Sequence, residues 1–129
     1  MRIQIVSLGV DDQDKALAFY TGVLGFEKKM DFPGQYRWLT VVSPQAPTGP
    51  ELQLAPKSAH PTMATYQDAL YQQGQPAMMF YVDDIQAEHE RLKKANVKFT
   101  KEPTKTTGST IATLDDTCGN LIQLTQLSW

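Results

Sequence analysis

The stretch Val10-Asp11-Asp12-Gln13-Asp14-Lys15-Ala16-Leu17-Ala18-Phe19-Tyr20, continued by Val23-Leu24-Gly25-Phe26, decides how this chain folds. Its apolar residues Ala16, Phe19, Tyr20 and Val23 recur at helical spacing. The two aspartates offer N-cap oxygens, and a glycine suits the left-handed residue that ends a helix. We therefore expect one helix here. A strand over 3–10 should precede it, and strands over 26–32, 36–43 and 51–55 should follow.

The same order returns in the second half of the chain. Val82-Asp83-Asp84 repeats Val10-Asp11-Asp12, Asn96 stands where Gly25 stood, and Leu121-Ile122-Gln123-Leu124 matches Glu51-Leu52-Gln53-Leu54. A constant offset between ordered landmarks indicates an internal repeat. In this second repeat we expect strands over 77–82, 97–101, 110–114 and 120–126. We predict an α+β fold of two tandem βαβββ modules with curled mixed sheets around a cup. One domain, 1–129, would comprise module 1 (1–56), a linker helix (57–76) and module 2 (77–129).

Alternation along the first and last strand of each module predicts two different faces. One face is apolar and should pack against the helix, with Val6, Leu8, Leu52 and Leu54 in the first module and Met78, Phe80, Val82, Ile122 and Leu124 in the second. The opposite face is mixed, and it carries Ile5, Ser7, Gly9, Gln53, Ala77, Met79, Tyr81, Gln123 and Thr125. Concave faces of this mixed character suit a small ligand.

Composition narrows the classes of partner. The net charge is −2, which argues against nucleic acid, because phosphate binding needs a basic surface. No apolar stretch approaches the roughly 20 residues of a membrane helix, and the first residues lack the layout of a signal peptide. A single cysteine, Cys118, excludes an intramolecular disulfide. We expect a cytoplasmic protein with no membrane partner.

These motifs resemble the glyoxalase/bleomycin-resistance/extradiol dioxygenase (vicinal oxygen chelate) superfamily. The Phe19-Tyr20 pair with Leu24-Gly25-Phe26 carries most of the resemblance, and Asp116-Thr117-Cys118-Gly119-Asn120 is similar to the turn before that family's last strand. The resemblance covers nearly the whole chain and implies the two-module, glyoxalase-like fold. It also implies a homodimer, since many relatives of this fold pair.

Metal-dependent members of the family place four side chains in the cup. Two come from the first strands and are often histidines, and two come from the fourth strands and are often glutamates. The resemblance puts Ile5, Ala77, Gln53 and Gln123 at these positions. The first two have no donor atom, and neutral amide oxygens are weak ligands for a transition metal. We therefore predict no metal and no other cofactor.

Three functional hypotheses remain open. The first is a metal-free protein that binds a small molecule through Ile5, Ser7, Trp38, Gln53, Ala77, Met79, Tyr81, Gln123 and Thr125. The second is a lyase, isomerase or dioxygenase of the same family whose metal is held by Glu51, Gln53, Gln123 or His60. The third is a scaffold that uses the fold only to dimerise. The sequence alone does not assign a catalytic role to any residue.

Overall fold

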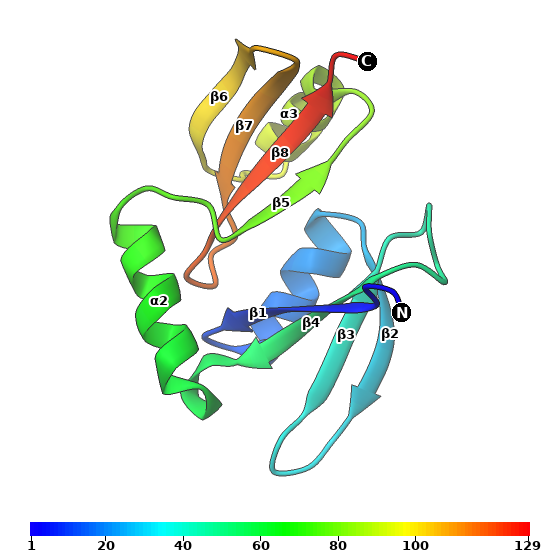
Figure 1. Ribbon diagram of the computed structural model, residues 1–129, viewed down its shortest axis with the longest axis vertical. Coiled ribbons are helices and arrows are strands. Elements are labelled where there is room, and N and C mark those ends of the chain that lie inside the picture. The colour runs from blue at the N-terminus through cyan, green and yellow to red at the C-terminus, as the bar shows by residue number, and fades with distance from the viewer. The chain divides into compact units, whose positions relative to one another are not determined.

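The computed structural model describes all 129 residues, which form two compact units, Met1–Tyr66 and Gln67–Trp129. The predicted modules 1–56 and 77–129 fall inside these units, and the division lies within helix α2 (Pro61–Gln72; Figure 1). None of the helices is long and apolar enough to cross a membrane. Each unit is built on its own four-stranded sheet.

The first unit has the predicted βαβββ order. Its sheet runs β1-β4-β3-β2, with β1 parallel to β4 and the other neighbours antiparallel. Its elements are β1 (Ile5–Val10), α1 (Gln13–Leu17), η1 (Ala18–Val23), β2 (Glu27–Phe32), β3 (Trp38–Val42), β4 (Glu51–Pro56) and η2 (Lys57–Ala59).

The second unit repeats this topology. Its sheet runs β5-β8-β7-β6, again with the first and last strands parallel and the rest antiparallel. Its elements after α2 are β5 (Met78–Tyr81), α3 (Ile85–Lys94), β6 (Phe99–Thr106), β7 (Ser109–Asp115) and β8 (Leu121–Leu127). Two open mixed sheets with βαβββ connectivity confirm the predicted fold class.

The predicted helix boundaries are confirmed in both units. The Asp12 carboxylate accepts a hydrogen bond from the backbone N–H of Lys15, and Asp84 accepts one from the N–H of Ala87, each at 3.1 Å. Both helices thus have an N-cap that satisfies an otherwise free donor. Gly25 and Asn96 adopt left-handed φ values of 94° and 65°, as the C′ position requires.

The strands β1 and β3 are shorter than the expected 3–10 and 36–43, and two further elements differ from expectation. The first helix widens into a π-helix over Ala18–Val23, where the N–H of Leu24 donates to the carbonyl of Phe19. The strand expected over 97–101 instead spans Phe99–Thr106 and continues past Pro103. Proline is tolerated there because β6 is an edge strand, and the pairing register with β7 shifts between Lys101 and Thr104.

Strand register confirms the two predicted faces. Leu8 pairs with Leu54 on the face that packs against the first helix, and both are almost fully buried. In the second unit Ile122 and Leu124 are buried in the same way on β8. Val6 belongs to the apolar face by register, yet it remains 37% exposed near the start of the edge strand β1.

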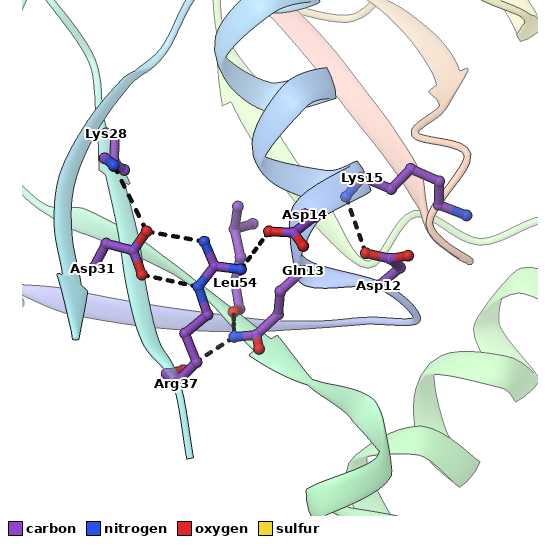
Figure 2. Close-up of polar contacts among 8 residues, drawn as sticks. All are labelled: Asp12, Gln13, Asp14, Lys15, Lys28, Asp31, Arg37 and Leu54. Atoms are coloured by element: carbon purple, nitrogen blue, oxygen red, sulfur yellow. Dashed lines mark hydrogen bonds and ion pairs between the residues drawn. The ribbon is translucent and has the colours of Figure 1, made fainter. Parts of the chain in front are cut away.

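An arginine holds the first helix against its sheet (Figure 2). The Arg37 guanidinium donates to both oxygens of Asp31 on β2, at 2.8 and 2.9 Å, and to Asp14 on α1 at 2.6 Å. The Gln13 amide adds bonds to the carbonyls of Arg37 and Leu54, at 3.0 and 2.9 Å. Such a bidentate pair is stronger and more directional than a single ion pair. Helix α1 is therefore tied to β2, β4 and the segment that precedes β3.

The Arg37 hydrogen bonds lower the pKa of Asp31 below its usual value, and Lys28 contributes less. We expect Arg37→Met to raise the pKa of Asp31 markedly and Lys28→Met to raise it slightly, as measured by NMR titration of the carboxyl carbon. Because the pKa is depressed in the folded state, the Asp31 interaction stabilises the fold above the unfolded-state pKa and is lost as pH falls through the folded one. Equal shifts in both variants would contradict this assignment.

Candidate functional site

The candidate site in the first unit lies on the sheet face that is opposite the helix. Register places Ser7 of β1 and Thr40 of β3 on either side of Gln53, which lies on β4 between these two strands. Ile5 is the register partner of Glu51, two residues away along the same face. Residues that are paired in register point to the same side of a sheet, so these five side chains share one surface.

A chain of hydrogen bonds crosses this face. The Ser7 hydroxyl donates to the Gln53 side-chain oxygen at 2.6 Å, and the Gln53 amide donates to the Tyr36 hydroxyl at 3.0 Å. The Tyr36 oxygen lies 2.9 Å from Nε2 of His60, and the two rings meet edge to face. Gln53 is only 5% exposed, so these partners satisfy an amide that would be costly to bury alone. The side chain is thereby fixed in one orientation.

A second polar group lies deeper on the same face. The Thr40 hydroxyl donates to Glu51 at 2.7 Å and accepts from the backbone N–H of Met30 at 3.2 Å. Thr40 is fully buried and Glu51 is 4% exposed. Trp38 precedes Thr40 by two residues on β3 and is half-buried, so the structure places it on the Gln53 face, which its sequence pattern did not decide.

The corresponding face of the second unit is more apolar and more open. Gln123 of β8 has Met79 and Thr113 as register partners, and Tyr81 is the partner of Thr125. The Gln123 amide donates to the Thr125 hydroxyl at 3.0 Å and approaches the Met79 sulfur at 3.7 Å. Met79 and Tyr81 are 59% and 68% exposed, although both are large and apolar.

Ala77 lies just before β5, where its N–H donates to the carbonyl of Leu121. It is half-buried and stands two residues before Met79. The structure therefore gathers the predicted residues on the open face of their own unit. Within the first unit Ser7 and Gln53 are in contact, and within the second Met79, Gln123 and Thr125 are.

The residues at the four family positions do not fit a catalytic metal. Ile5 and Ala77 offer no donor atom, and the Gln53 oxygen already accepts the Ser7 hydroxyl. No group of three or more His, Cys, Asp or Glu side chains in the chain is placed to hold a metal ion. The face can instead present amide, hydroxyl and aromatic groups to a bound molecule.

Sequence reasoning missed the roles of Tyr36, Thr40 and His60 in this face. Positions 36, 38 and 40 alternate with Arg37 and the buried Leu39. This alternation could have predicted that Tyr36 and Thr40 share one face of the sheet with Trp38. His60 follows the short helix η2 in the connection after β4. No local pattern brings such a residue to the sheet face, so its contact with Tyr36 appears only in three dimensions.

Comparison with known proteins agrees with this geometry. A sequence model of the Glyoxalase/Bleomycin resistance protein/Dioxygenase superfamily matches residues 2–124, and the chain belongs to that superfamily. The protein YurT of Bacillus subtilis (strain 168) is 54% identical over 127 residues, covering 98% of this chain and 99% of its own.

Two solved structures share the fold closely. UcmS2 superposes with a TM-score of 0.81 at 35% identity, and 97% of each chain is covered. TnmS3, described as an antibiotic binding protein from Streptomyces sp. CB03234, superposes with a TM-score of 0.80 at 31% identity, covering 99% of this chain and 97% of that one.

The two units offer a matched test of the buried hydroxyl on β3. We expect Thr40→Val to lower the free energy of unfolding by about 1–3 kcal/mol, because Glu51 and the Met30 N–H both lose their partner. Thr113→Val removes the equivalent hydroxyl of β7, which bonds no other side chain, and should change stability by less than about 0.5 kcal/mol. Urea unfolding measures both, and similar losses in the two variants would refute the role given to Thr40.

Proposed function

We propose that this protein binds a small organic molecule, with no resident catalytic metal, through the open sheet faces that carry Gln53 and Gln123. The observation that carries the proposal is the exposure of Met79 and Tyr81 beside the Gln123 amide. Large apolar groups next to a few fixed polar groups are typical of ligand sites. The full proposed set is Ile5, Ser7, Trp38, Gln53, Ala77, Met79, Tyr81, Gln123 and Thr125.

The first unit supports the proposal with a prepared polar anchor. Gln53 is held between Ser7 and Tyr36, so its orientation does not have to be fixed when a ligand arrives. Ser7 is exposed, and its hydroxyl oxygen keeps acceptor capacity after donating to Gln53. The indole of Trp38 adds apolar area and one N–H donor.

The relatives favour binding as well. TnmS3 is described as an antibiotic binding protein, and the match with this chain extends over nearly the full length of both. We therefore infer that the ligand is of antibiotic or metabolite size, with aromatic or other apolar area that contacts Met79 and Tyr81 and polar atoms that reach Gln123.

The alternative is a metal-dependent lyase, isomerase or dioxygenase with a non-standard ligand set. It requires a stoichiometric metal held by Glu51, Gln53, Gln123 or His60. Two of these side chains are already engaged by protein donors, Gln53 by Ser7 and Glu51 by Thr40. Metal analysis of the purified protein separates the two hypotheses, since the binding hypothesis expects sub-stoichiometric metal.

The binding test uses a panel of natural-product antibiotics that includes bleomycin, followed by tryptophan fluorescence and calorimetry. We expect at least one member to bind saturably, with the same affinity after the protein is treated with EDTA. Tyr81→Ser should weaken binding about tenfold or more, because it removes an exposed aromatic contact. Tyr66→Ser is the matched control, since Tyr66 is 64% exposed on α2 and outside the proposed set. Equal loss in both variants, or binding that requires a metal, would overturn the proposal.

We further propose a homodimer that resides in the cytoplasm, with no nucleic acid or membrane partner. The family resemblance supports pairing, and the net charge of −2 supports the absence of a nucleic-acid role. Native mass spectrometry should report twice the chain mass of 14.4 kDa and any ligand retained from the cell. A monomer at micromolar concentration would remove the dimer from the proposal.

A further inference from the structure

The hydrogen-bond chain on the open face of the first unit has a direction. The Ser7 hydroxyl donates to Oε1 of Gln53 at 2.6 Å, and Nε2 of Gln53 donates to the Tyr36 hydroxyl oxygen at 3.0 Å. A phenol has one proton of its own, and the partner left for it is Nε2 of His60, 2.9 Å away. All three protons therefore point from Ser7 toward His60.

This direction depends on the imidazole at the far end of the chain. When Nε2 of neutral His60 carries a lone pair, and Nδ1 carries the proton, every donor in the chain has an acceptor. With the opposite tautomer, two donors would meet at the Tyr36 oxygen and the phenol proton would have no partner in the chain. The tautomer of His60 and the orientation of the Gln53 amide are thus linked.

Ser7 is the end of the chain that a ligand meets. Its side chain is exposed, and its only proton is committed to Gln53, so the oxygen offers lone pairs and no donor. Gln53 is 5% exposed, so at this end of the chain the serine, and not the amide, contacts a bound molecule. A ligand group that bonds to Ser7 therefore has to bring its own proton.

The other polar groups of the face have the same bias. The Thr40 hydroxyl donates its proton to Glu51 at 2.7 Å, and its oxygen accepts the backbone N–H of Met30. The Glu51 carboxyl adds further oxygen acceptors. None of the strands β1, β3 and β4 contains a lysine or an arginine. A face with many acceptors and no cationic side chain on these strands favours a ligand group that donates, and it disfavours an anion.

We propose that the Ser7 end of this chain selects a neutral hydroxyl or N–H group of the ligand, which donates to the Ser7 oxygen. Tyr36 and His60 are positioning residues for this preference, because they hold the Gln53 amide in the orientation that consumes the Ser7 proton. If the amide turned over, its N–H would meet the Ser7 oxygen and the serine proton would be offered to the ligand. The inference rests on the proposed function, since it names the chemistry of a group that binds on the Gln53 face.

The test compares 2-naphthol with 2-methoxynaphthalene at pH 8, with amide chemical shifts of the full-length, ¹⁵N-labelled protein as the readout. The two probes share one ring system and both are uncharged, but only the naphthol has a proton to donate. We expect saturable shifts at Ser7 and Gln53. The naphthol should bind about fivefold more tightly or better, because the ether leaves the Ser7 oxygen without a donor.

Tyr36→Phe removes the acceptor that orients the Gln53 amide. We expect the ratio of the two affinities to fall to about one, because the amide can then turn and free the Ser7 proton for the ether oxygen. Ser7→Ala should lower the ratio in the same way by removing the acceptor itself. Tyr66→Phe is the matched control, since Tyr66 is 64% exposed on α2, and it should keep the ratio. A merely structural role for Tyr36 would weaken both probes equally and leave the ratio unchanged.

The tautomer of His60 gives an independent measurement. Ring ¹⁵N chemical shifts at pH 8 should show Nε2 without a proton, and His60→Gln assigns the signals, since the chain has two histidines. A proton on Nε2, equal affinity for the two probes, or no saturable binding of either one would refute the inference. The antibiotic panel with Tyr81→Ser tests the proposed function separately. Equal binding of both probes therefore refutes only the direction of the chain, whereas a panel without a binding member refutes the function.

Discussion

The parallel pairing of the first and last strand in each unit determines which side chains reach the open face. Ser7 pairs with Gln53 in one unit and Met79 with Gln123 in the other. A slip of one residue would turn Gln53 into the helix-covered core and bring Leu52 and Leu54 to the surface. Burial of the leucines against the helix therefore fixes the strand register, and this register places the glutamine side chains on the open face of the sheet.

The two units use one topology for different chemistry. At equivalent places, Thr40 has two hydrogen-bonding partners, whereas the Thr113 hydroxyl bonds no other side chain. Gln53 is held by hydroxyl groups, whereas Gln123 lies beside a thioether. The first face is thus a rigid polar surface and the second a more adaptable one, since methionine can change its shape at little cost.

Most of the fold follows from local patterns in the sequence. The aspartate caps, the left-handed Gly25 and Asn96, and the alternation along the strands all act within a few residues, and the repeat supplied the tandem arrangement. Family membership followed from the same motifs. The extension of β6 past Pro103 was missed because a proline suggests a strand end unless the strand is known to lie at an edge.

The polar contacts of the site were less predictable. Gln53 meets Tyr36 across 17 residues of chain, and Tyr36 meets His60 across 24. Arg37 lies outside any strand and reaches Asp14 across 23 residues. Contacts between irregular segments that are far apart in the chain produce no periodic pattern of residues, so a single sequence does not predict them. The set of ligand-binding residues itself remains a prediction.

The presence of a separate capped helix and a separate hydrogen-bonded sheet in each unit has an evolutionary consequence. Substitutions on the open face of one sheet leave the strand pairing of the other unchanged, because the two sheets share no strand. One unit can therefore keep its residues as the open face of the other diversifies, so new specificities can arise through a few substitutions on an unchanged topology.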